Sequence, residues 1–112
     1  MNTTAVHVWT AICHIDDIPP LGARIVRPEG LDAIAVFRAS DGHVFAVFNR
    51  CPHKGGPLSD GLVHGHTVTC PLHNWNINLE NGEACAPDTG CVRTIDVRLH
   101  DGRVYLALPG LE

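Results

Sequence analysis

Hydrophobic positions along this chain fall in short runs, several of which alternate with polar positions, and turn residues interrupt them repeatedly. Almost no window has the i, i+3, i+4 apolar spacing of a long helix. β-Branched and aromatic residues, which fit the pleated surface of a sheet, occur in several of the runs. The pattern therefore predicts an all-β fold, with strands over 6–12, 23–27, 33–38, 44–48, 62–69 (a hairpin), 76–79, 92–99 and 104–108.

Turn residues separate the predicted strands. The paired prolines in 16–20 remove two backbone donors and end any ladder there. Ser-Asp-Gly at 40–42 and Asp-Gly at 101–102 suit tight hairpins, and Gly65 lies near the tip of the 62–69 hairpin. Asn-Gly at 81–82 predicts a type I′ turn. We therefore expect neighbouring strands to pair mostly as antiparallel hairpins.

Length, composition and charge limit the class of protein. A chain of 112 residues with 45% hydrophobic residues suits one compact domain over 1–112. The net charge of −4 argues against a nucleic-acid surface and is compatible with docking on a partner protein. The start of the chain does not resemble a signal peptide, and no segment is long and apolar enough to span a bilayer. We therefore expect a cytoplasmic protein with no membrane contact.

Two mixed cysteine–histidine pairs are the candidate metal ligands. They are Cys51-Pro-His53 and Cys70-Pro-Leu-His73, so each short, proline-stiffened loop offers one thiolate and one imidazole. A single tetrahedral zinc ion usually takes its two cysteines from one pair and its two histidines from another. A two-iron cluster explains the mixing if the cysteines bind one iron and the histidines the other. We therefore expect one [2Fe–2S] cluster per chain, with a zinc-stabilised interaction domain as an alternative.

These loops resemble the two cluster-binding loops of Rieske proteins, over 51–58 and 70–73. Their surroundings, 61–69 and Asn74-Trp75, are similar to the small subunits of assimilatory NAD(P)H-dependent nitrite reductases. The resemblance implies a Rieske-type [2Fe–2S] fold of small antiparallel sheets. It also implies a cluster-binding subdomain, about 49–80, inserted into a base β-sandwich formed by the N- and C-terminal strands.

What the resemblance implies about function is one-electron transfer by an oxidoreductase subunit that is not catalytic alone. The expected partner is a large nitrite reductase subunit that carries FAD, an iron–sulfur cluster and sirohaem and reduces nitrite to ammonium in nitrate assimilation. The alternative is a free Rieske ferredoxin that serves a ring-hydroxylating dioxygenase. Such ferredoxins usually have glycine after the second histidine, whereas this chain has Asn74-Trp75, which favours the nitrite reductase subunit.

The resemblance also implies a low reduction potential. High-potential Rieske proteins have an extra cysteine in each loop, at the positions of Gly56 and Leu72, and these cysteines form a disulfide. They have hydroxyl residues at the positions of Trp75 and Ile77, which donate hydrogen bonds to sulfur. Loss of those donors disfavours the reduced cluster and lowers the potential. Trp75 can equally be a core aromatic, and the argument then depends only on the missing hydroxyls.

The remaining cysteines and histidines have no assigned chemistry at this stage. We expect the three other cysteines to be reduced thiols, and most of the six other histidines to be solvated loop or strand residues. These residues are Cys13, Cys85 and Cys91, and His7, His14, His43, His64, His66 and His100.

Overall fold

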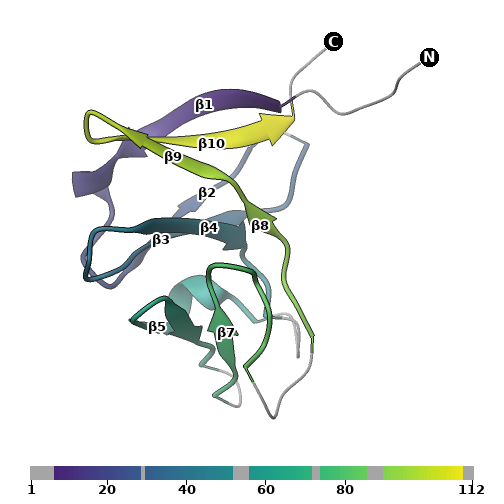
Figure 1. Ribbon diagram of the computed structural model, residues 1–112. Helices are drawn as coiled ribbons and strands as arrows, with labels where there is room; N and C mark the ends of the chain where they lie inside the picture. Colours follow the sequence, from purple (N-terminus) through teal and green to yellow (C-terminus); the bar gives the residue numbers. More distant parts are fainter. Residues whose placement is uncertain (1–6, 29, 52–55, 72–73, 86–89, 110–112) are drawn as a thin grey trace.

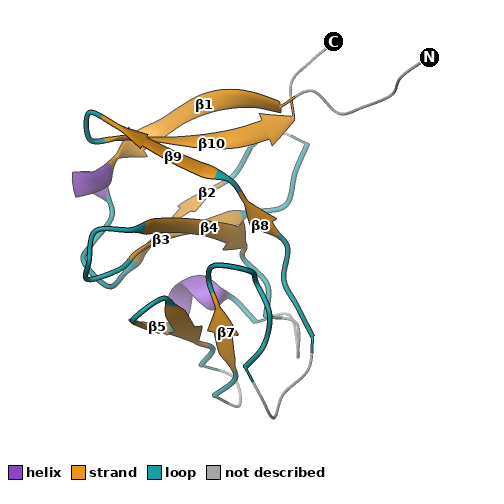
Figure 2. Cartoon of the chain, in the orientation of Figure 1, coloured by secondary structure: helices purple, strands orange, loops and turns teal. Residues whose placement is uncertain are grey.

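The computed structural model describes residues 7–28, 30–51, 56–71, 74–85 and 90–109, and their strands form three antiparallel sheets (Figures 1 and 2). The first sheet has the order β1 (His7–His14), β10 (Arg103–Pro109) and β9 (Val97–His100). The second has the order β2 (Ala23–Val26), β3 (Ile34–Arg38), β4 (Val44–Phe48) and β8 (Thr94–Ile95). The third has the order β5 (Leu62–His64), β6 (Thr67–Thr69) and β7 (Asn76–Asn78).

The all-β prediction is confirmed, because the helices of the described residues are two single 3-10 turns. These turns are η1 (Ile15–Asp17) and η2 (Leu58–Asp60), drawn in purple in Figure 2. His14 caps η1 through its Nδ1 atom, which accepts the N–H of Asp16 at 3.2 Å. Within the described residues no helix has the length and apolar character needed to cross a bilayer.

Strand β3 belongs to the second sheet, which lies between the other two sheets, and both faces of β3 are buried. Ile34 and Val36 belong to the apolar core that the second sheet shares with Val104 and Leu106 of the first sheet. Side chains alternate across a strand, so the intervening residues face the opposite side, where they join a second core with the third sheet. This placement explains why β3 is an uninterrupted apolar run rather than an alternating one.

The third sheet is small and packs against the outer face of the second sheet, at the bottom of Figure 1. Val63, Val68 and Ile77 lie opposite one another across its strands, and all three are buried in the second core. We call this second core, shared by the second and third sheets, the lower core; its members are Ala35, Phe37, Val47, Cys51, Leu58, Val63, Val68, Cys70, Ile77, Leu79 and Val92. The arrangement is a base sandwich with a smaller sheet stacked on it.

The segment predicted as one strand over 92–99 is two strands in different sheets. β8 pairs with β4 of the second sheet, and β9 pairs with β10 of the first. The change of partner occurs at Asp96, whose carbonyl accepts the N–H of Ala107. A hydrophobic pattern records which residues are buried but not which of two stacked sheets takes each part of a strand. The hairpin about 101–102 has the expected geometry, with positive φ at both Asp101 (51°) and Gly102 (79°).

The prediction of a type I′ turn at 81–82 is wrong. That turn needs positive φ at both central residues, but Gly82 (78°) has it and Asn81 does not. The chain makes a longer turn instead, in which the Gly82 N–H donates to the Asn78 carbonyl at 2.7 Å. Side-chain oxygens of Asn78 and Asn81 each accept a backbone N–H two residues on, at 2.8 and 2.9 Å. These side-chain turns compete with the two-residue hairpin.

Candidate metal centre

Cys51 and Cys70 lie together in the lower core although 19 positions separate them in the sequence. Cys51 follows β4 after two residues, and Cys70 follows β6 directly. Both residues are almost completely buried, with exposed fractions of 2% and 0%. The second and third sheets therefore bring the two predicted thiolate ligands into one apolar environment.

Each cysteine begins a loop that a backbone hydrogen bond closes in the same way. The Cys51 N–H donates to the Gly56 carbonyl at 2.7 Å, and the Cys70 N–H donates to the Trp75 carbonyl at 2.7 Å. Both bonds join residues five positions apart, so the two cysteines have the same backbone arrangement. The predicted imidazole ligands, His53 and His73, lie outside the described residues.

Hydrogen bonds made by polar side chains hold the two ends of the first loop together, a feature that sequence reasoning missed. Asn49 Oδ1 accepts the Ser59 N–H at 2.8 Å, and Asn49 Nδ2 donates to Ser59 Oγ at 3.0 Å. This pair of bonds joins the chain before Cys51 to η2 after the loop. The signal in the sequence is an amide residue two positions before the cysteine, which is too common in loops to be informative by itself.

A comparable hydrogen bond joins the residues that flank the second loop. Thr69 and Asn76 are partners across β6 and β7, and Thr69 Oγ1 donates to Asn76 Oδ1 at 2.5 Å. His64 Nε2 lies 2.7 Å from the same hydroxyl oxygen. Because Thr69 immediately precedes Cys70, these contacts hold the strand end from which the cysteine projects into the core.

The two positions with missing hydroxyls are occupied by apolar side chains beside the buried cysteines. Ile77 is completely buried in the lower core with Cys51 and Cys70. Trp75 is half-buried and packs against the same core. Trp75 therefore packs at the edge of the core, and the side chain at position 77 has no hydrogen to donate to sulfur.

No disulfide is present, as all five cysteines are described and each has an unbridged sulfur. Cys13 is half-buried in the base, where burial raises the pKa of its thiol. Cys85 donates its backbone N–H to the Asn76 carbonyl, and Cys91 is exposed. The two buried cysteines of the lower core thus fit a soft metal ion or an iron–sulfur cluster, because thiolate is the ligand that such groups prefer.

The surface beside Cys51 carries positive charge. An open hollow of about 820 Å³ is lined there by Cys51, Arg50, Arg93 and the acidic Asp32, among others. Arg50 and Arg93 are exposed, and the chain as a whole has a net charge of −4. The three charged side chains that line this hollow therefore sum to +1, opposite in sign to the charge of the whole molecule.

Comparisons with known proteins agree with this geometry. A family model described as the Rieske [2Fe–2S] domain matches residues 8–96. The 3-phenylpropionate/cinnamic acid dioxygenase ferredoxin subunit of Photorhabdus laumondii is 37% identical over 99 residues, covering 87% of this chain and 91% of that protein. The anthranilate 1,2-dioxygenase ferredoxin subunit of Burkholderia cepacia is 42% identical over 105 residues, covering 93% and 95%.

A solved structure from Mycobacterium tuberculosis has the same fold. It was provisionally assigned as an NADH-dependent nitrite reductase small subunit. The superposition has a TM-score of 0.82 with 27% identity and covers 95% of this chain and 99% of that chain.

Proposed function

Because the chain belongs to the Rieske [2Fe–2S] domain family, we propose that one thiolate and one imidazole from each loop hold its cluster: Cys51, His53, Cys70 and His73. The observation that carries this assignment is the burial of Cys51 and Cys70 in one apolar core, each at the start of a loop closed over five residues. When bound, a Rieske cluster accepts and releases one electron. The chain is accordingly a Rieske-type electron-transfer protein.

The residues around the cysteines set the conditions for electron transfer. The apolar lower core excludes water from the two cysteine sulfurs. The side-chain hydrogen bonds of Asn49 and Thr69 hold the chain in place just before each cysteine. Two neutral imidazoles in place of two thiolates reduce the negative charge of the centre, so that adding an electron is electrostatically easier than with four thiolates. Position 77 carries no hydroxyl that would stabilise the reduced form further.

The finer function that we propose is that of a ferredoxin component that passes electrons to an oxygenase. Two relatives with 37% and 42% identity are ferredoxin subunits of dioxygenases, and the match covers 91% and 95% of their lengths. Identity at this level over nearly whole proteins outweighs the local Asn74-Trp75 feature, which favours a nitrite reductase subunit. On this proposal the partner oxygenase binds the organic substrate, and the present chain has no catalytic residue.

The second candidate is the small subunit of a cytoplasmic nitrite reductase. It is favoured by the likeness to the M. tuberculosis structure and by the residues after the second loop, Asn74-Trp75. The partner would then be a large subunit bearing FAD, an iron–sulfur cluster and sirohaem. Both candidates use the same centre, and they differ in whether the chain moves between partners or stays bound to one.

The experiment has two stages, of which the first tests the centre. The purified protein is assayed for iron and acid-labile sulfide, and the dithionite-reduced form is examined by electron paramagnetic resonance with detection of nitrogen couplings. We expect two irons and two sulfides per chain and couplings to two imidazole nitrogens, as for a Rieske cluster. Zinc without sulfide would instead support the zinc-stabilised interaction domain and exclude electron transfer.

The second stage separates the two partners. A flavin reductase, this protein and the oxygenase component of an anthranilate dioxygenase are mixed with NADH, and consumption of anthranilate is measured. The ferredoxin proposal predicts turnover that needs this protein and is absent with the Cys70→Ser variant. Co-purification with a sirohaem protein at a fixed ratio, together with NADH-dependent loss of nitrite and no support of the oxygenase, would favour the second candidate.

A further inference from the structure

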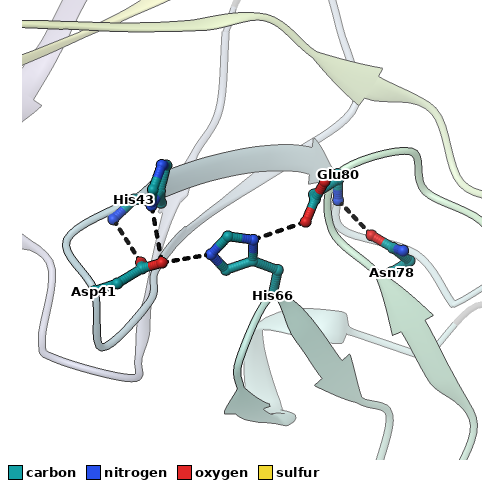
Figure 3. A network of polar contacts seen from close by, with 5 residues as sticks. All are labelled: Asp41, His43, His66, Asn78 and Glu80. Atoms are coloured by element: carbon teal, nitrogen blue, oxygen red, sulfur yellow. Dashed lines mark hydrogen bonds and ion pairs between the residues drawn. The ribbon is translucent and has the colours of Figure 1, made fainter.

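A carboxylate and two imidazoles converge where the base meets the third sheet (Figure 3). Asp41 and His43 lie on the turn between β3 and β4, and His66 lies at the tip of the β5–β6 hairpin. Asp41 Oδ2 is 2.9 Å from His43 Nδ1 and 2.7 Å from His66 Nε2. One ligand atom from each of the three residues lies within 4.8 Å of the other two.

A fourth residue fixes the orientation of the His66 ring. Glu80 Oε2 lies 2.7 Å from His66 Nδ1, and the backbone N–H of Glu80 donates to Asn78 Oδ1 at 2.8 Å (Figure 3). The ring also packs against Phe45, with 4.8 Å between the ring centroids. His66 is therefore held between two carboxylates and has little freedom to turn.

This geometry requires a cation on the imidazole of His66. A neutral imidazole has a single N–H, so it can donate to only one of the two carboxylates at 2.7 Å. If Nδ1 donates to Glu80, the lone pair of Nε2 faces the Asp41 oxygen. Both of these atoms are then acceptors, and they repel each other. A second proton on the ring removes the conflict, and so does a metal ion that Nε2 and Asp41 share.

We propose that Asp41, His43 and His66 form a binding site for a divalent transition metal of the zinc class, with Glu80 holding the far nitrogen of His66. Imidazole nitrogen with carboxylate oxygen is a donor set that zinc and its neighbours accept readily, whereas magnesium and calcium prefer oxygen alone. A carboxylate that accepts the second N–H of a metal-binding histidine is the usual support of such ligands. Three protein ligands leave a fourth position for water.

Small movements of exposed side chains suffice to admit the ion. Zinc bonds to nitrogen and oxygen of about 2.0–2.2 Å place the ligand atoms of a tetrahedral site roughly 3.4 Å apart. The Asp41 contacts of 2.7 and 2.9 Å must therefore widen by about 0.5–0.7 Å, and the His43 and His66 nitrogens, within 4.8 Å of each other, must approach by at most about 1.4 Å. The side chains of His43 and Asp41 are 64% and 48% exposed and can move outward, while the more enclosed His66, at 28%, stays in place.

The ion would join the two layers of the molecule near the candidate centre. Strand β6 leads from the residue after His66 to Thr69, immediately before Cys70, so a metal on His66 tethers this strand to the β3–β4 turn. The tether limits opening of the third sheet away from the base. The proposed zinc site does not depend on which protein receives electrons, because none of its residues belongs to the proposed cluster ligands.

The test is a calorimetric titration of zinc chloride into the protein with its cluster intact. The zinc and iron content of the protein is then measured after gel filtration. We expect one zinc per chain with iron retained, and weaker binding at lower pH because protons compete for the imidazoles. Asp41→Asn and His43→Gln should each abolish saturable binding, and Glu80→Gln should weaken it by about 10- to 100-fold. His100→Gln is the matched control, because His100 lies 3.3 Å from the carboxylate of Asp101 and does not belong to the Asp41, His43 and His66 group.

A second readout follows the tether itself. Zinc should slow backbone amide exchange across β5 and β6 in the wild-type protein and leave it unchanged in His43→Gln. Absence of saturable binding at millimolar zinc would overturn the proposal. So would zinc affinity that is equal in the wild type, Asp41→Asn and His43→Gln, or zinc uptake that occurs only with loss of iron, since the ion would then occupy the cysteine site.

Discussion

The imidazole of His66 lies 2.7 Å from the carboxylate of Asp41, and this contact joins the hairpin that leads to Cys70 with a turn of the base 25 residues earlier in the chain. Hydrogen bonding raises the pKa of His66, first through Glu80 and then through Asp41. The pKa of Asp41 is lowered, first by the backbone N–H of His43 and then by the His66 side chain. The folded state thus favours a protonated imidazole between ionised carboxylates.

The first prediction is a pH-dependent contribution of His66 to stability. A raised histidine pKa stabilises the folded state fully below the ordinary value of about 6.5, and this stabilisation is lost as the pH rises through the folded pKa. The lowered Asp41 pKa contributes above about pH 4 and is lost as the pH falls through its folded value. In metal-free buffer, His66→Gln should therefore lower the free energy of unfolding more at about pH 6 than at about pH 9.

Denaturant unfolding of both proteins at the two pH values measures this difference. His100→Gln, which alters an exposed histidine beside a single aspartate, serves as the control and should show a smaller pH dependence. An equal effect of His66→Gln at the two pH values would mean that the imidazolium makes no special contribution.

The second prediction concerns the cysteines. Cys51→Ser and Cys70→Ser should each reduce iron and sulfide to background, because a serine hydroxyl is a poor ligand for an iron–sulfur cluster and both positions are buried in the lower core. Cys13→Ser is the matched control, since Cys13 lies half-buried in the other core. Elemental analysis of the purified variants is the measurement. Full iron content in Cys70→Ser would remove this residue from the ligand set.

The third prediction compares two glycines that share positive φ but differ in surroundings. Gly82 (φ 78°) lies so close to the segment before β8 that an added Cβ would clash with the Val92 carbonyl oxygen. Gly65 (φ 58°) has nothing within 4 Å of that position. Alanine at either site costs roughly 1–2 kcal/mol for the left-handed backbone. Gly82→Ala should lose about 1–3 kcal/mol more, because backbone atoms must move apart.

Thermal or denaturant unfolding of the two variants checks the comparison. The difference between them, rather than either value alone, reports the packing of the 79–82 turn against the segment before β8. Equal destabilisation would show that this turn can move away from Val92 at little cost.

The fourth prediction is that a hydroxyl at position 77 raises the reduction potential. Ile77 is completely buried in the core that contains both cysteines. Ile77→Thr should shift the potential to a more positive value, because a donor to sulfur stabilises the reduced form. Ile77→Val has nearly the same shape without the hydroxyl, so the difference between the two isolates the hydrogen bond. Removing the methyl group should cost about 0.5–1.5 kcal/mol of stability.

Voltammetry of the two variants beside the wild type gives the three potentials. Identical potentials for the threonine and valine variants would show that the side chain at position 77 does not reach the sulfur atoms. A shift in both variants alike would instead point to packing as the cause.

Local patterns in the sequence were sufficient for the strands and for the kind of centre. Alternation and turn residues predicted the all-β fold, because side-chain period and positive φ are properties of a few neighbouring residues. The mixed Cys51–His53 and Cys70–His73 spacing led to the Rieske family, since two short loops carry nearly all of that signal. The single-domain organisation, all four cluster ligands (Cys51, His53, Cys70 and His73) and a cytoplasmic location stay predictions.

The sequence could not decide matters that depend on contacts between distant segments. The division of 92–99 between two sheets follows from stacking at Asp96, and the turn at 81–82 follows from competing side-chain hydrogen bonds. The sequence assigned no role to His66, which the fold places between Asp41 and Glu80. Burial, pKa and metal affinity arise from groups far apart in the chain, so only the tertiary structure determines them, whereas ligand type and strand pattern are set by neighbours in the sequence.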